Sequence, residues 1–185
     1  MLFAMLLLAA VPAAGHAKTT ATGRVVDPEG HPIAGAQVCN VRDGKVQDCV
    51  QAGVDGGYRI ETPKGQRVFV RASGFVGAEA EAGPRSTPLV LGRAATLVVH
   101  VVDAATSQPL ASGKVLIYTP SGRTFGDPVP FNRAGLRVST LEPGDVLVRA
   151  EAAGFDPGGP LPISLVAGKE QTLTIPMRKA AKNAP

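Results

Sequence analysis

The chain of 185 residues carries 19 lysine and arginine residues against 15 aspartate and glutamate residues, and the net charge of +4 is spread along its length. Basic residues do not gather with aromatic ones, which argues against a nucleic-acid-binding surface. Glycine (22) and proline (16) are abundant, tryptophan is absent, and no apolar stripe at helical spacing runs far. Many turns with few large aromatic residues predict short antiparallel strands rather than helices.

Residues 1–17 have the pattern of a secretory signal peptide. An uncharged apolar run extends from Leu2 to Val11, and Gly15 and Ala17 are the small residues that precede a cleavage site before Lys18. The run is shorter than the roughly 20 apolar residues that span a bilayer, and an uncleaved membrane anchor is the alternative. We therefore expect a periplasmic or secreted protein with no integral membrane segment after cleavage.

The next part of the chain is expected to form short strands separated by turns. Asp27-Pro28-Glu29-Gly30 and Pro63-Lys64-Gly65 are strong turn signals, because proline presets φ and glycine tolerates positive φ. Residues 74–84 form either a strand edge or a mobile loop, and residues 92–95 are a short candidate linker. The expected strands are 20–26, 36–42, 46–51, 58–61, 68–73 and 88–91.

The second part repeats this pattern of strands and turns. Residues 121–132, with two prolines, are expected to form a loop, and residues 141–144 form a turn. The C-terminal segment 179–185 lacks apolar content and is expected to be a disordered basic tail. The expected strands are 96–102, 113–119, 134–140, 145–150, 161–166 and 171–177.

The two parts echo each other in sequence. Residues 68–75 and 146–155 both alternate apolar and polar positions and then break at a Gly-Phe pair, which is the pattern of a strand with one buried face. Val25-Val26-Asp27 corresponds to Val101-Val102-Asp103, and the offset drifts only from 76 to 80 residues along the chain. We therefore expect two tandem all-β domains, at residues 18–92 and 93–178, that arose by duplication.

The motifs of the first unit resemble the carboxypeptidase regulatory-like domain. They are Gly23-Arg24-Val25-Val26-Asp27, Pro32-Ile33-Ala34-Gly35 and Asp55-Gly56-Gly57-Tyr58. The resemblance implies a transthyretin-like, Greek-key antiparallel β-sandwich for each unit, and no peptidase activity, because no peptidase domain accompanies it. The second unit departs from the pattern at Ser112, where a glycine is expected, and lacks a counterpart of Asp55.

Cys39 and Cys49 are the two cysteines of the chain. An exported protein enters an oxidising compartment, so we expect these cysteines to form a disulfide. They flank Arg42-Asp43-Gly44-Lys45, a hairpin signal. A simple two-residue Asp43-Gly44 turn would place Cys39 opposite Asp48, so direct opposition of the cysteines requires a different loop or a bulge. The alternative is a pair of free buried thiols.

No catalytic or cofactor-binding constellation is evident. His31 and His100 are too far apart for a zinc site, and the acidic residues mostly occupy turns, where aspartate caps backbone amides. Phe125, Phe131 and Tyr118 are the candidate ligand-binding residues; the alternative is that both phenylalanines cap the second core.

We therefore expect an exported, non-enzymatic binding or scaffold protein of the cell envelope, with an envelope protein or a glycan as its partner. A carbohydrate-binding module is the first alternative. An accessory subunit of a hydrolase or peptidase is the second.

Overall fold

A computed structural model describes residues 18–63, 66–83 and 88–181. Over these ranges the chain consists of strands and turns, with no α-helix, as the composition predicts. No helix in the described part is long and apolar enough to cross a membrane. The expected signal peptide, residues 1–17, lies outside the described residues.

The first sandwich comprises strands β1 to β7, which form two facing sheets in the orders β4-β1-β7 and β3-β2-β5-β6. Alternating burial along β4 and β5 shows that each sheet turns one face inward. The strands are β1 (Lys18–Val26), β2 (Gln37–Arg42), β3 (Lys45–Gln51), β4 (Gly57–Pro63), β5 (Arg67–Arg71), β6 (Ala78–Glu81) and β7 (Leu89–Val90).

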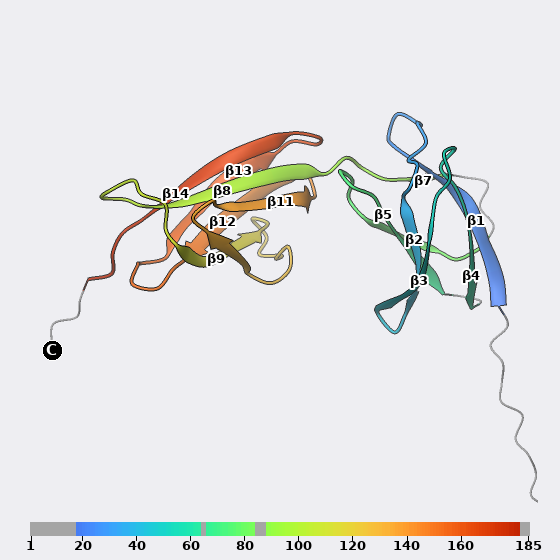
Figure 1. Ribbon diagram of the computed structural model, residues 1–185, viewed down its shortest axis with the longest axis horizontal. Helices are drawn as coiled ribbons and strands as arrows, with labels where there is room; N and C mark the ends of the chain where they lie inside the picture. Colours follow the sequence, from blue (N-terminus) through green and yellow to red (C-terminus); the bar gives the residue numbers. More distant parts are fainter. Residues whose placement is uncertain (1–17, 64–65, 84–87, 182–185) are drawn as a thin grey trace, which may run out of the picture.

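The second sandwich comprises β8 to β14, in the orders β11-β8-β14 and β10-β9-β12-β13. Figure 1 shows the two sandwiches as separate bodies joined by one short segment. The strands are β8 (Ala95–Asp103), β9 (Ser112–Tyr118), β10 (Val129–Asn132), β11 (Leu136–Leu141), β12 (Gly144–Glu151), β13 (Gly158–Leu165) and β14 (Glu170–Met177).

The strand orders of the two sandwiches are identical once β8 is matched to β1, β9 to β2 and so on. Each sandwich also has its own buried core, drawn from residues 21–91 in the first and 95–177 in the second. The sequence repeat therefore corresponds to two units with the same topology, and the expected fold class of two antiparallel β-sandwich domains is confirmed. The boundary placed between residues 92 and 93 stays a prediction.

The sandwiches differ most in the strand that runs parallel to the first one. In the second sandwich, β14 pairs with β8 from Glu170 to Met177, whereas in the first sandwich β7 pairs with β1 only at Leu89 and Val90. Over the described residues, the parallel pairing with the first strand is therefore shorter in the first sandwich than in the second.

The β2–β3 hairpin carries the disulfide between Cys39 and Cys49. Asp43 and Gly44 both have positive φ, which is the geometry of a two-residue hairpin turn, and this turn pairs Arg42 with Lys45. A bulge between Cys39 and Val41 then shifts the register by one residue and places the two cysteines directly opposite each other. The hairpin thus combines the two-residue turn with the bulge that direct opposition requires.

Two local expectations are wrong. Residues 121–132 are not entirely a loop, because Val129–Asn132 form β10 and pair with β9. The start of the expected disordered tail is ordered against the Gly154-Phe155 pair. The Ala180 amide donates to the Gly154 carbonyl at 3.0 Å, and Lys179 forms an isolated β-bridge with Phe155. Backbone pairing, which composition does not reveal, orders both segments.

Candidate functional site

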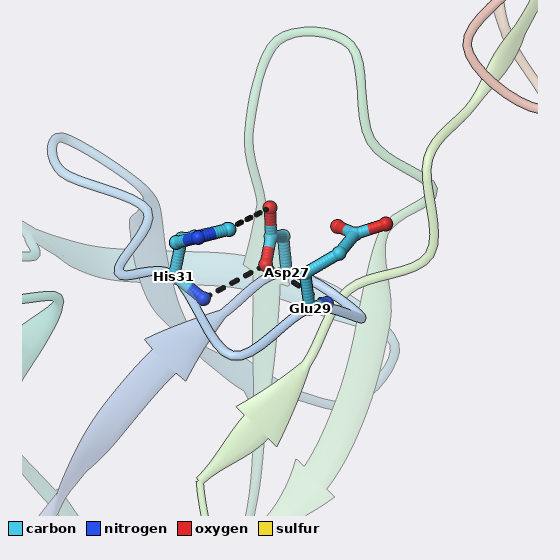
Figure 2. Close-up of side chains that lie close together, drawn as sticks. All are labelled: Asp27, Glu29 and His31. Carbon is cyan, nitrogen blue, oxygen red and sulfur yellow. Dashed lines mark hydrogen bonds and ion pairs between the residues drawn. The ribbon is translucent and has the colours of Figure 1, made fainter.

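One polar cluster lies at the end of β1, where the linker at residues 92–95 passes close to the turn that follows this strand. Asp27 follows Val26, and one of its oxygens, Oδ1, accepts the backbone amides of Glu29 (3.0 Å) and His31 (2.8 Å). Figure 2 shows the other oxygen, Oδ2, facing the His31 ring, with Nδ1 at 3.3 Å. This side chain therefore closes the turn by capping backbone amides, as expected for an aspartate in such a position.

Arg93, from the linker, completes the cluster. Its Nη2 donates to Asp27 Oδ2 and to Glu29 Oε2, each at 3.0 Å. Burial raises the pKa of Asp27, but the backbone and side-chain hydrogen bonds from His31 outweigh this effect and hold the pKa below its ordinary value. The hydrogen bond to Glu29 raises the pKa of Arg93. The group is therefore an ion pair that ties the linker to the first sandwich.

The same three side chains, Asp27, Glu29 and His31, also have the composition of a metal-ligand set, since one ligand atom from each lies within 4.8 Å of the others. A guanidinium nitrogen already contacts both carboxylates, and His31 remains 76% exposed. A cation would have to displace Arg93 from the two carboxylates. We therefore interpret the cluster as a latch, which we call the linker latch, rather than as a metal site.

The second sandwich repeats the latch at its own exit. Asp103 caps the Ala105 amide through Oδ1 (2.8 Å), and Lys179 Nζ lies 3.9 Å from Asp103 Oδ2. In both copies the segment that leaves the last strand crosses the Gly-Phe pair, with bridges of Phe75 to Arg93 and of Phe155 to Lys179. In each copy, the aspartate at the end of the first strand caps a turn and lies beside a cation from the segment that leaves the last strand.

A cleft of about 340 Å³ opens between the edges of β3 and β4 in the first sandwich. Val50 and Ile60 supply apolar lining, and amide and charged side chains surround them, among them Gln47 and Asp48. Two inner residues are polar: Asn40 is 4% exposed and Thr62 is 1% exposed. These two residues come from opposite sheets, so the cleft reaches between the layers.

The oxygens of these two inner side chains lack partners. Asn40 Nδ2 donates to the Glu61 carbonyl at 2.7 Å, but neither Asn40 Oδ1 nor Thr62 Oγ1 has a hydrogen-bond partner among the described residues. A buried unpaired polar group costs about 1–3 kcal/mol of stability. The first sandwich therefore carries two unfavourable groups at one place.

The second sandwich has apolar residues at the matching positions. Asn40 pairs with Val68 and Ile117 pairs with Val148, and each valine lies seven residues before the phenylalanine of its Gly-Phe pair. Ile117 is 5% exposed. The fold therefore accepts an isoleucine where the first sandwich has Asn40.

The same holds on the facing sheet. Thr62 pairs with Thr19, and Leu141 pairs with Ala95, each partner being eight residues before the latch aspartate of its own sandwich. Leu141 is 4% exposed and belongs to the second core. The polar cleft is thus a difference between two copies of one fold, not a requirement of the fold.

The candidate residues named from sequence lie elsewhere. Phe131 is 4% exposed and belongs to the second core, where Gly113 leaves space for its ring. Phe125 is partly buried against the same core and lies under the Arg123 guanidinium, 5.2 Å from the ring centre. Tyr118 is half-buried at the end of β9. The core position of Phe131 corresponds to the alternative that the sequence left open.

Sequence reasoning did not find Asn40 and Thr62. A signal was present, because both fall on the inward-facing parity of strands whose neighbouring inward residues, Val38 and Ile60, are apolar. Only the structure shows that these two positions line one cleft, and strand register shows that they match apolar residues in the second copy.

Comparisons with solved structures give distant similarity. A streptococcal ancillary pilin is 15% identical with a TM-score of 0.41, over 89% of this chain and 63% of that one. The Bacillus anthracis TIE protein is 14% identical with a TM-score of 0.42, over 88% and 34%. The minor pilin GBS52 of Streptococcus agalactiae is 16% identical with a TM-score of 0.42, over 90% and 98%. The chain thus spans less than two thirds of the first two structures.

No curated protein matches the chain. The first sandwich, however, matches a known family over residues 20–93, which is nearly its whole described extent. The match covers the turn at Asp27, the disulfide hairpin and the Asp55-Gly56-Gly57-Tyr58 motif that carried the resemblance. The matching family model is that of the carboxypeptidase regulatory-like domain, and the match covers residues 20–93.

Proposed function

We propose that this protein is an exported, non-catalytic binding or scaffold module of the cell envelope, built from two carboxypeptidase regulatory-like sandwiches. The observation that carries the proposal is the linker, which is hydrogen-bonded on both sides. The Ala94 amide donates to Gly74 of the first sandwich, and the Ala94 carbonyl accepts from Gly168 of the second, each at 2.9 Å. Such a linker holds the spacing between two binding surfaces.

Two further features support this role. The disulfide fits an oxidising compartment outside the cytoplasm. Three aspartates are engaged in structure: Asp55 Oδ1 accepts the Gly57 amide at 2.9 Å, and Asp27 and Asp103 cap turns beside Arg93 and Lys179. The loop tips and sheet edges are the surfaces that remain for a partner.

Site-specific photo-cross-linking in envelope preparations tests the proposal. A cross-linking residue replaces Val54, which is 91% exposed at the tip of the β3–β4 loop, and a control carries it at Arg59 on the outer face of β4. We expect one discrete adduct with an envelope component from Val54 and none from Arg59. Identical adducts from both positions, or none from any loop tip, would contradict a specific binding role.

Export is tested separately. Mass spectrometry of the protein recovered from its producing cells should show an amino terminus at Lys18 and a mass two hydrogens below that of the reduced form. A chain that retains residues 1–17 with both thiols free would contradict the proposed location.

A further inference from the structure

We propose that the cleft between β3 and β4 of the first sandwich binds a neutral saccharide of one or two rings. The site consists of Asn40 and Thr62 at its inner end, Val50 and Ile60 as its apolar lining, and Gln47 and Asp48 at its rim. This inference goes beyond the scaffold role and does not depend on it.

The size of the cleft argues for a ligand rather than a single structural water. A water molecule takes about 30 Å³ in the liquid, so a cleft of about 340 Å³ has room for roughly ten of them. The volume falls at the lower end of the range of small-molecule sites, about 300–1,000 Å³. One or two sugar rings fit this range, whereas a folded partner does not.

The inner end of the cleft defines the chemistry of the ligand. Asn40 Oδ1 can only accept a hydrogen bond, so the group that reaches it has to carry an O–H or N–H donor. Asn40 and Thr62 are neutral and nearly fully buried, and they cannot compensate an ionic group taken out of water. A hydroxyl or a secondary amide meets both conditions.

The rest of the lining favours a polyhydroxylated molecule. Each sugar hydroxyl both donates and accepts, and the amides of Gln47 and Gln66 with the carboxylate of Asp48 offer both functions. Arg42, Asp48 and Glu61 line the same cleft, so its charges are of both signs and do not favour an anion. The C–H face of a sugar ring can rest on Val50 and Ile60.

The second sandwich shows that the polar pair is dispensable for folding. Its matching positions hold Ile117 and Leu141, and Leu97 stands where the first sandwich has Ala21, six residues before the latch aspartate in each copy. The first sandwich thus has smaller and more polar groups at one end of its core. We attribute this difference to ligand binding.

The experiment is a titration of the ¹⁵N-labelled protein, followed by NMR, with glucose, galactose, N-acetylglucosamine and cellobiose at millimolar concentrations. We expect saturable shifts of the Asn40 side-chain amide and of the Val50 and Ile60 backbone amides for at least one sugar. Signals of the second sandwich, such as Ile117, serve as the internal control and should not move. N-acetylglucosamine against glucose shows whether an amide donor is preferred.

Two sets of variants complete the test. N40I/T62L installs the residues of the second sandwich, should keep or raise the melting temperature, and should weaken sugar binding at least tenfold. Q47A alters only the rim and should weaken binding, whereas K45A, on the same strand but outside the cleft, should not.

Three outcomes would overturn the proposal. The first is the absence of saturable shifts with all four sugars, whether or not N40I/T62L is more stable than the wild type. The second is undiminished binding by N40I/T62L. The third is binding of an uncharged acetylated dipeptide amide by a protein that ignores the sugars. The cross-linking test of the scaffold role is independent of all three outcomes.

Discussion

Reduction of the Cys39–Cys49 disulfide should destabilise the first sandwich and leave the second unchanged. The bridge closes a loop with a sequence separation of 10 residues. In the chain-entropy estimate such a loop restricts the unfolded state by about 9 cal/mol/K, which corresponds to about 2.7 kcal/mol of stability at 25 °C. Reduction removes little packing, because most side chains of β3 are exposed, so the entropic contribution should dominate.

The assay is urea unfolding with and without a phosphine reductant. The chain has two tyrosines and no tryptophan, so a Tyr118→Phe variant leaves Tyr58, in the first core, as the fluorescent reporter. The methyl signal of Ile117 reports the second sandwich by NMR. We expect C39A/C49A to behave like the reduced protein.

The reasoning would be refuted in two ways. One is a change of less than about 0.5 kcal/mol in the first transition on reduction, which is far below the loop estimate. The other is an equal shift of the Ile117 transition, which would mean that the two sandwiches unfold as one unit.

Three other predictions concern the second core and the linker. Gly113→Ala should destabilise the second sandwich by about 1–3 kcal/mol, because the added methyl group would clash with the Glu151 carbonyl oxygen and the Phe131 ring. Gly92→Ala meets nothing within 4 Å and should be near neutral in thermal unfolding. Asp27→Asn should lower the melting temperature at pH 7. The folded-state pKa of Asp27 is lowered, so its contribution is present above about pH 4 and lost as pH falls further, where variant and wild type should converge; a constant difference down to acid pH would contradict this assignment. Arg93→Ala should speed hydrogen exchange of the neighbouring linker amide and broaden the scattering-derived distance distribution; no change in either would show that the linker latch does not hold the linker.

Local sequence patterns predicted the strands well, because one-sided burial imposes alternation and because turns need glycine, proline or aspartate at particular positions. The segment that contains β10 was missed, since two prolines and few apolar residues hid a short edge strand that its pairing with β9 defines. The docked start of the tail was missed for a related reason. Lys179 and Ala180 are ordered by the Gly154-Phe155 pair, a contact between segments far apart in the sequence.

The disulfide shows both what the sequence could predict and what it could not. Compartment and cysteine count predicted the bridge, and hairpin arithmetic showed that a bulge or a different loop was required for direct opposition. The choice between a longer loop and a bulge could not be made from the sequence, because both satisfy the same spacing. The structure has the bulge, between Cys39 and Val41.

The amino-acid sequence by itself determined the all-β class, the twofold repeat, the turn roles of the aspartates and the family resemblance of the first unit, because all of these lie in neighbouring residues or in their periodic spacing. Only the tertiary structure decided that Arg93 reaches back to Asp27 and that Asn40 and Thr62, from opposite sheets, line one cleft. Both depend on which strands pair and in which register, and pairing between distant segments has no local signature.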